Sequence, residues 1–297
     1  MLPSGRRYSL TASSSYPESL TLSSGASVSS FEASETEEWI TTSDGYQLYT
    51  RVYRPVHRDP CAILVLVHGF GEHSDRYAPL CRRFTHVGVQ VYTYDQRGYG
   101  KTGLRSKRPG HTYGFDTLTN DLSFICSRAY NANIPTVIFG HALGAVVALS
   151  YLTSPLHRLP VAGLICQASA MLTNTDLHPP KLAVSLGHLA AKVLKTLTIS
   201  ANVLPEYLTR DKRVVADFIS SKYNYEIGSL QCLSDLLRRG SMLLDRKSLQ
   251  LDCPVLITHG DNDLITPHAG SIQLFEKLPY DMDKELKIYR GCYHERK

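Results

Sequence analysis

The sequence has few of the features that mark metal-binding, secreted, membrane-spanning or nucleic-acid-binding proteins. Its seven cysteines include no C-x-x-C pair, which argues against structural zinc and disulfides and for free thiols in a reducing compartment. No apolar run reaches the roughly 18 residues of a membrane-spanning helix, and no segment resembles a signal peptide. The net charge of +5 is small and not gathered into a basic stripe, so we expect no nucleic-acid partner.

The N-terminal segment, residues 1–38, is rich in serine and threonine and ends in a cluster of glutamates. This composition predicts a disordered tail, with order beginning near Trp39. Arg6 and Arg7, which lie among serines, leave a mitochondrial transit peptide or a basophilic kinase site as alternatives.

Beyond the tail, short apolar runs alternate with segments of helical spacing. An antiparallel hairpin is predicted where two strand-like segments flank Ser43-Asp44-Gly45. Five further strands are predicted at 62–67, 89–94, 161–167, 254–258 and 285–289, and a sixth leads into residue 140. The alternation predicts an α/β fold with a mostly parallel central sheet and helices on both faces. We assign residues 39–169 and 250–297 to this core.

Residues 170–249 interrupt the alternation, because they contain helical segments and proline breakers but no convincing strand. We interpret them as a helical cap inserted into the core. Along residues 181–197, polar side chains follow one helical stripe and apolar side chains fill the rest. The stripe comprises Lys181, Ser185, His188, Lys192 and Lys195. Two interpretations remain open: an interfacial helix that contacts a membrane, or a cap helix packed on the core. Either predicts an apolar pocket beneath it that could hold an acyl chain.

The stretch from Thr136 to Leu149 runs from a β-branched strand through a glycine-flanked turn into an apolar helix. This is the pattern of a nucleophile elbow, G-x-S-x-G, in which a strained turn raises the serine above the sheet. Gly140 and Gly144 supply the glycines, but Ala142 occupies the serine position. The elbow is therefore predicted without its attacking atom.

Two later loops complete a hydrolase-like order along the chain: elbow, then acid, then histidine. Asp263 is the predicted acid and His294 the predicted base, with Asp261 as the rival acid that more often caps its loop. The backbone N–H groups of Phe70 and Leu143 are the predicted oxyanion donors.

His68, Glu72 and His73 suggest a metal site, but their spacing is not that of a zinc-binding helix. A hydrogen-bonded structural role fits His68 better, and packing fits His141. We expect no metal and no cofactor.

These motifs together resemble the monoacylglycerol lipase branch of the α/β-hydrolases, also called serine aminopeptidase S33-like. The resemblance spans roughly residues 38–297 and rests on five segments, 64–77, 95–100, 140–144, 260–263 and 287–295. It implies the same acid, base and oxyanion donors. It also implies that Glu72 and Arg76 line the glycerol-binding end of the pocket, the alternative being a solvated salt bridge at a helix start.

Two departures from the family bear on function. Ala142 replaces the nucleophilic serine, and the chain ends shortly after His294, where the family continues into a closing helix. We therefore expect a lipid ester hydrolase of monoacylglycerol lipase type that is catalytically silent. Three explanations remain: a pseudoenzyme that binds acyl lipids or proteins, a working lipase whose serine was changed to alanine, or weak hydrolysis by another route. The expected ligand is a lipid ester or fatty acyl chain, and the expected location is cytoplasmic, peripheral on membranes or lipid droplets.

Overall fold

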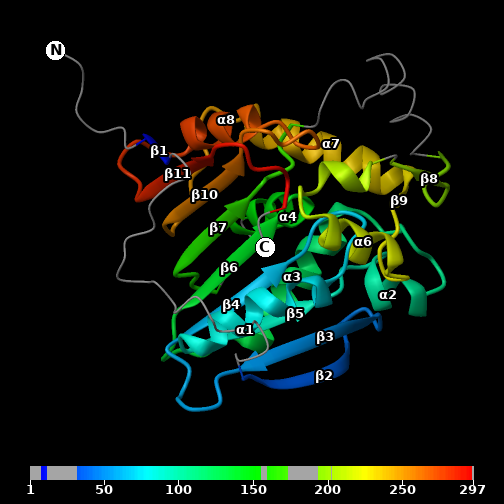
Figure 1. Ribbon diagram of the computed structural model, residues 1–297, viewed down its shortest axis with the longest axis horizontal. Coiled ribbons are helices and arrows are strands. Elements are labelled where there is room, and N and C mark those ends of the chain that lie inside the picture. The colour runs from blue at the N-terminus through cyan, green and yellow to red at the C-terminus, as the bar shows by residue number, and fades with distance from the viewer. Residues whose placement is uncertain (1–7, 12–31, 155–158, 173–192, 202, 296–297) are drawn as a thin grey trace.

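The computed structural model describes residues 8–11, 32–154, 159–172, 193–201 and 203–295. Within them nine strands form one sheet, in the order β1-β11-β10-β7-β6-β4-β5-β3-β2 (Figure 1). The strands are β1 (Tyr8–Thr11), β2 (Ser34–Thr41), β3 (Gln47–Arg54), β4 (Ala62–Val67), β5 (Val89–Tyr94), β6 (Thr136–His141), β7 (Gly163–Gln167), β10 (Val255–Gly260) and β11 (Lys284–Tyr289). Every pairing is parallel except β2 with β3 and β3 with β5. The predicted mostly parallel sheet and entry hairpin are confirmed.

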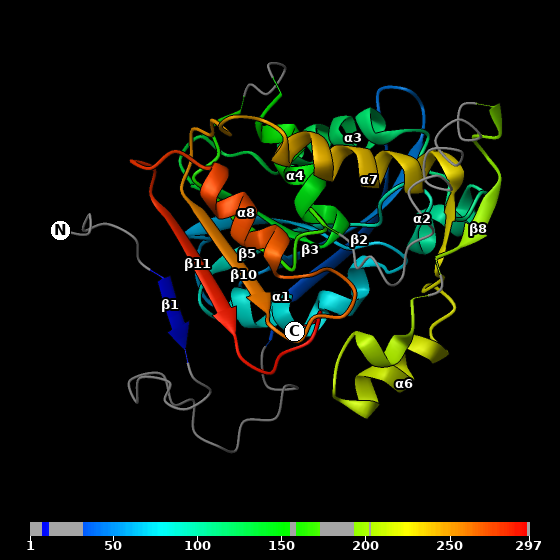
Figure 2. The same ribbon diagram turned by 90° about the horizontal axis from the view of Figure 1, so that it is seen from above.

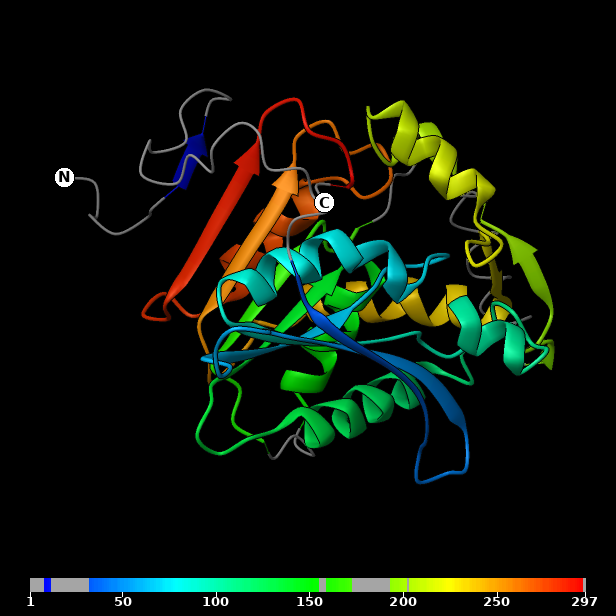
Figure 3. The ribbon, with the colours of Figure 1, turned by 60° about the horizontal axis from the view of Figure 1, so that its bottom comes forward.

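Helices cover both faces of the sheet, as the alternation predicts. Figure 3 shows α1 (Ala78–His86) and α3 (Phe115–Ala129) on opposite sides. α3 packs in one layer with α4 (Leu143–Leu152), α7 (Leu230–Leu244) and α8 (Ala269–Lys277), as seen from above in Figure 2. α4 is apolar on nearly all sides, which fits its burial among α3, α7 and the sheet. Each face of the sheet has its own buried apolar cluster.

Helix α7 falls within residues 170–249, which the sequence analysis interprets as the cap. It packs against α3, α4 and α8. The reason is an apolar face that includes Leu236, Leu243 and Leu244, all buried. Helical spacing reveals such a face but does not say which neighbour covers it.

The rest of the predicted cap also contains strands that the sequence did not indicate. β8 (Thr198–Ser200) and β9 (Ile227–Ser229) form a small antiparallel sheet, with α6 (Lys212–Ser220) between them. Such short strands leave too few residues for a visible alternation. Most of the predicted lysine stripe, residues 181–192, lies outside the described residues, as do 1–7 and 12–31 of the predicted tail.

The N-terminal boundary of the fold also differs from the prediction. β2 begins at Ser34, before Trp39, because the glutamates that suggested a tail have partners on β3 and α1. Glu35 and Glu37 both pair with Arg51 of β3, and Glu35 also pairs with Arg82 of α1. β1, which lies within the predicted tail, pairs in parallel with the outer edge of β11.

Candidate active site

The turn between β6 and α4 has the strained geometry of a nucleophile elbow. Ala142 adopts φ 49° and ψ −111°, a backbone conformation that L-residues rarely occupy. Its N–H donates to the Gln167 carbonyl (3.0 Å), and its carbonyl accepts from the Ala170 N–H (3.2 Å). A Cβ at Gly140 would lie 2.6 Å from the Ala145 Cα, and a Cβ at Gly144 would overlap the Val67 carbonyl. Both glycines are therefore needed for the close approach of the turn.

Asp263 and His294, far apart in the sequence, lie in direct contact. His294 Nδ1 is 2.7 Å from Asp263 Oδ2, and both side chains are buried. The N–H groups of Ile265 (2.8 Å) and Thr266 (2.9 Å) donate to Asp263 Oδ1 and fix the carboxylate. An imidazole that donates through Nδ1 keeps its lone pair on Nε2, which is the arrangement a general base requires.

A second histidine, His259, contacts the same carboxylate, and sequence reasoning assigned it no role. Its Nε2 lies 3.0 Å from Asp263 Oδ2 and 2.8 Å from the Thr266 carbonyl. Because both partners are acceptors, Nε2 carries the hydrogen, and Nδ1 accepts from Ser271 Oγ at 2.7 Å. The sequence could have pointed to His259, because it lies at the carboxyl end of a strand, two residues before Asp261.

The Asp263 carboxylate and the His294 imidazole shift each other's pKa. Burial opposes the charged carboxylate, but the charge of His294 and the hydrogen bonds from both histidines lower the pKa of Asp263 well below its usual range. Burial likewise opposes a charged imidazole, but the Asp263 carboxylate outweighs it and raises the pKa of His294. The pair therefore favours an ionised aspartate beside a histidine of increased basicity.

The rival acid, Asp261, lies elsewhere in the same loop. Its Oδ1 accepts from the Gly291 N–H at 2.5 Å, which ties the loop after β10 to the turn after β11. This contact is that of a loop-capping residue. The structure thus places Asp263, and not Asp261, against His294.

The predicted oxyanion donors flank the elbow on two sides. Leu143 directly follows Ala142 and begins α4. Phe70 lies in the loop after β4, next to Gly69, where a Cβ would come within 3.3 Å of the Ala142 Cβ. The Phe70 ring packs edge-on against Tyr99 at 5.3 Å. The N–H groups of Phe70 and Leu143 are thus carried by the two backbone segments that adjoin Ala142.

Glu72 and Arg76 lie in a buried ionic cluster, which corrects the idea of a solvated salt bridge. Arg76 Nη1 contacts Glu72 Oε2 at 2.6 Å, and its guanidinium also pairs with Glu295. Glu72 Oε1 accepts from the Gly69 N–H (2.7 Å) and the Tyr77 hydroxyl (2.6 Å). No local pattern marks Glu295 as a member of this cluster, because it lies 219 positions from Arg76 along the chain.

The remaining histidines near the site have structural partners. His141 Nδ1 lies 3.1 Å from Glu72 Oε1, and its ring centroid is 4.8 Å from that of His294. His68 Nε2 accepts from the Gln96 N–H at 2.9 Å. Among the described residues, no group of three or more histidine, cysteine, aspartate or glutamate side chains is arranged to hold a metal ion.

A sequence model of the family described as "Serine aminopeptidase, S33" matches residues 58–296, most of the chain. The chain belongs to the serine aminopeptidase S33 family. Among its relatives, a putative monoglyceride lipase of Schizosaccharomyces pombe is 33% identical over 83% of this chain and 65% of its own length. The chain thus spans just under two thirds of that protein. The human monoglyceride lipase is 29% identical over 86% of this chain and 82% of its own length.

The chain is also similar to solved structures of monoglyceride lipases. A soluble variant of monoglyceride lipase from Saccharomyces cerevisiae, solved with a substrate analog, superposes with a TM-score of 0.77 at 25% identity and covers 86% of each chain. The monoacylglycerol lipase of Paleococcus ferrophilus gives 0.72 at 26% identity, over 84% of this chain and 90% of its own. The chain is therefore a monoglyceride-lipase-like α/β-hydrolase, as its motifs predicted.

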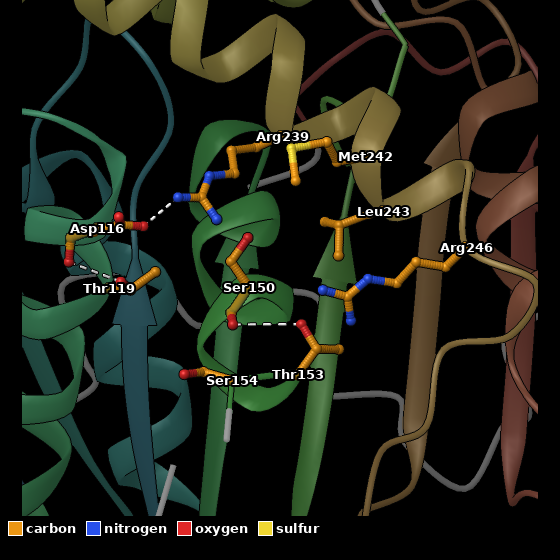
Figure 4. Close-up of a pocket in the computed structure, with 9 residues that line it drawn as sticks. All are labelled: Asp116, Thr119, Ser150, Thr153, Ser154, Arg239, Met242, Leu243 and Arg246. Atoms are coloured by element: carbon orange, nitrogen blue, oxygen red, sulfur yellow. Dashed lines mark hydrogen bonds and ion pairs between the residues drawn. The ribbon is translucent and has the colours of Figure 1, made fainter. Parts of the chain in front are cut away.

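A separate pocket lies among the helices α3, α4 and α7 (Figure 4). It is lined by Asp116 and Thr119 of α3, by Ser150, Thr153 and Ser154 at the end of α4, and by Arg239, Met242, Leu243 and Arg246 in and after α7. None of these residues belongs to the elbow, the acid–base pair or the ionic cluster. The pocket is therefore not part of the candidate active site.

Proposed function

We propose that this chain binds lipid esters of the acylglycerol class in a monoglyceride lipase-type site and does not hydrolyse them through an acyl-serine. One observation carries the proposal: the elbow and the Asp263–His294 pair are in place, while position 142 bears a methyl group. The relatives whose names include monoglyceride lipase support the ligand class.

The missing hydroxyl has a large expected effect on rate. Loss of the serine of a catalytic triad lowers turnover roughly 10⁶-fold, which corresponds to about 8 kcal/mol of barrier. Oxyanion donors and substrate binding would preserve only a small residual activity. We therefore expect this chain to bind the ester but to hydrolyse it at most very slowly.

Other nucleophiles close to the elbow are poorly placed to replace the serine. Ser169 follows the strained residue Ala168, but its hydroxyl is fully buried and lies 3.1 Å from Ser271 Oγ. Cys292 lies on the loop of His294, two residues before the base. Neither residue occupies position 142, where the start of α4 and the loop that carries Phe70 adjoin.

Restoring the serine tests the proposal. We expect Ala142→Ser to hydrolyse a monoacylglycerol and a short-chain ester, because residue 142 lies in a strained turn after β6 and Asp263 contacts His294. The unsubstituted chain should bind the same monoacylglycerol saturably, measured by calorimetry, without releasing fatty acid. Turnover by the unsubstituted chain at a rate similar to Ala142→Ser would overturn the proposal, as would the absence of any acylglycerol binding by either protein.

We also propose that the region between β7 and α7 contacts lipid surfaces peripherally. Val193 is 81% exposed and Ile219 63% exposed, and four further apolar side chains of this region are 43–50% exposed. These are Leu194, Leu197, Ile199 and Leu204. Within the described part of the chain, no helix has the length and apolar character needed to cross a membrane. Co-sedimentation with phospholipid vesicles should fall when Val193 and Ile219 are changed to serine, and unchanged co-sedimentation would contradict this surface.

The proposed location is the cytoplasm. All seven cysteines have free thiols in the structure, and burial raises the pKa of Cys81, Cys126 and Cys166. Buried thiols without disulfide partners fit a reducing compartment.

A further inference from the structure

We infer that Glu295 is a positioning residue for His294, because its buried pairing with Arg76 holds the histidine loop against the loop that carries Phe70. The inference rests on the proposed ester-hydrolase type of site. In this inference Arg76 holds Glu295 in place and does not contact the substrate directly.

The pairing has the geometry of a strong, directional contact. Arg76 Nη1 lies 2.6 Å from Glu295 Oε1, and Nη2 lies 2.8 Å from Oε2. The Arg76 side chain is 10% exposed and the Glu295 side chain 3%. Two parallel bonds between a planar guanidinium and a carboxylate fix orientation as well as distance. The residue next to His294 is therefore held in both position and rotation.

The same guanidinium continues the connection to the other side of the elbow. Arg76 Nη1 also contacts Glu72 Oε2, and Glu72 Oε1 accepts from the Gly69 N–H, next to Phe70. On the other side, the Glu295 N–H donates to the Leu208 carbonyl at 2.7 Å. In Figure 2 the chain after β11 crosses the end of β10 toward α1, which makes this connection between distant segments.

The cluster also surrounds His294 with charge. The groups on or near His294 are Asp263 and Thr266 from the loop after β10, Glu72 and Arg76 from the segment before α1, His141 from β6, and Glu295 itself. Burial lowers the basicity of the imidazole, but Asp263 first, and then Glu295 and Glu72, raise the pKa of His294. A role limited to packing would not produce this dependence on the Glu295 charge.

The first measurement uses the chain as it exists and needs no substrate. Histidine NMR titration should show a lower pKa for His294 in Glu295→Gln than in the unsubstituted protein, because glutamine keeps the shape and removes the charge. The matched control is Glu276→Gln on the exposed face of α8, which should leave the titration of His294 unchanged.

The second measurement uses Ala142→Ser as the background. Adding Glu295→Gln should lower kcat roughly 10-fold to 100-fold, as expected for a misplaced catalytic group, and change KM by no more than about twofold. Adding Arg76→Gln as well removes one charge of each sign. The double substitution should therefore return the His294 titration toward its original position but leave kcat low, since the connection between the loops is still lost.

The outcomes distinguish this inference from the proposed function. If Ala142→Ser has no activity, the proposed function fails, but the titration in the unsubstituted background still tests Glu295. If Glu295→Gln does not fold, Glu295→Asp, which keeps the negative charge beside Arg76 but is too short to keep both bonds, provides the same kcat test. An unchanged His294 titration in Glu295→Gln, or a kcat within about twofold of Ala142→Ser, would overturn the inference.

Discussion

Ala142 holds a backbone conformation that benefits a serine nucleophile and gives an alanine no advantage. A non-glycine residue in such a sparsely populated region carries roughly 1–3 kcal/mol of strain. The hydrogen bonds of its N–H to Gln167 and of its carbonyl to Ala170 hold it there. The strain is therefore present in the fold although residue 142 carries no hydroxyl group.

Relief of this strain is measurable. We expect Ala142→Gly to raise the free energy of unfolding by about 1 kcal/mol, because glycine accepts positive φ without a Cβ clash. The control is Ala145→Gly in α4, which should lower stability by about 1 kcal/mol or more, since glycine is unfavourable inside a helix. Urea denaturation of the three proteins gives the comparison. A loss of stability in Ala142→Gly would contradict the assignment of strain to this residue.

The Asp263–His294 pair makes stability depend on pH in a defined direction. The lowered pKa of Asp263 contributes stability that is present above its unfolded value and lost as pH falls through the folded value. The raised pKa of His294 contributes stability that is present below its unfolded value and lost as pH rises through the folded value. The pair therefore stabilises the fold most between the unfolded values of about 3.9 and 6.5.

Asp263→Asn tests this dependence. Without the carboxylate, the pKa of His294 should fall, and the decline in stability from about pH 6.5 toward alkaline pH should become shallower than in the unsubstituted chain. Urea denaturation across that range gives the slope for each protein. Equal slopes would show that His294 titrates without regard to Asp263.

At the scale of elements, the elbow depends on how closely β6, α4 and β4 approach one another. Gly144 lies in the first turn of α4, directly over the Val67 carbonyl at the end of β4. Backbone meets backbone there, so no side-chain rotation can make room for a methyl group. The junction therefore tolerates glycine alone.

Gly144→Ala is expected to destabilise the protein by about 3 kcal/mol, the upper part of the range for overpacked cores. Gly163→Ala on β7 is the matched control, because its nearest neighbour would be 3.8 Å from the added Cβ, an ordinary contact distance. Thermal melts of both variants provide the test. Similar melting temperatures for the two would refute the close packing at the elbow.

An element could be predicted when the residues of that element alone carry the pattern that identifies it. β4 and β5 lie where they were predicted, because β4 is a short apolar run and β5 is a short segment rich in valine, tyrosine and threonine. α7 was recognised as helical but assigned to the cap, because periodicity does not identify the packing partner. β8 and β9 were missed, because three residues show no alternation.

At the scale of the whole molecule, the sequence could predict which loops meet but not which side chains connect them. The carboxyl ends of parallel strands share one edge, so the meeting of Asp263 with His294 follows from the order of the strands. The contact between Arg76 and Glu295 joins residues 219 positions apart. No local pattern marks either residue as the partner of the other, so only the structure reveals the cluster.

Covalent labelling tests the central claim most directly, namely that the site is complete except for one oxygen atom. The unsubstituted chain and Ala142→Ser would each be treated with a fluorophosphonate, and the added mass located by mass spectrometry. The account predicts rapid labelling of Ala142→Ser at residue 142 and none of the unsubstituted chain. Labelling of both proteins at another residue, or of neither, would contradict it.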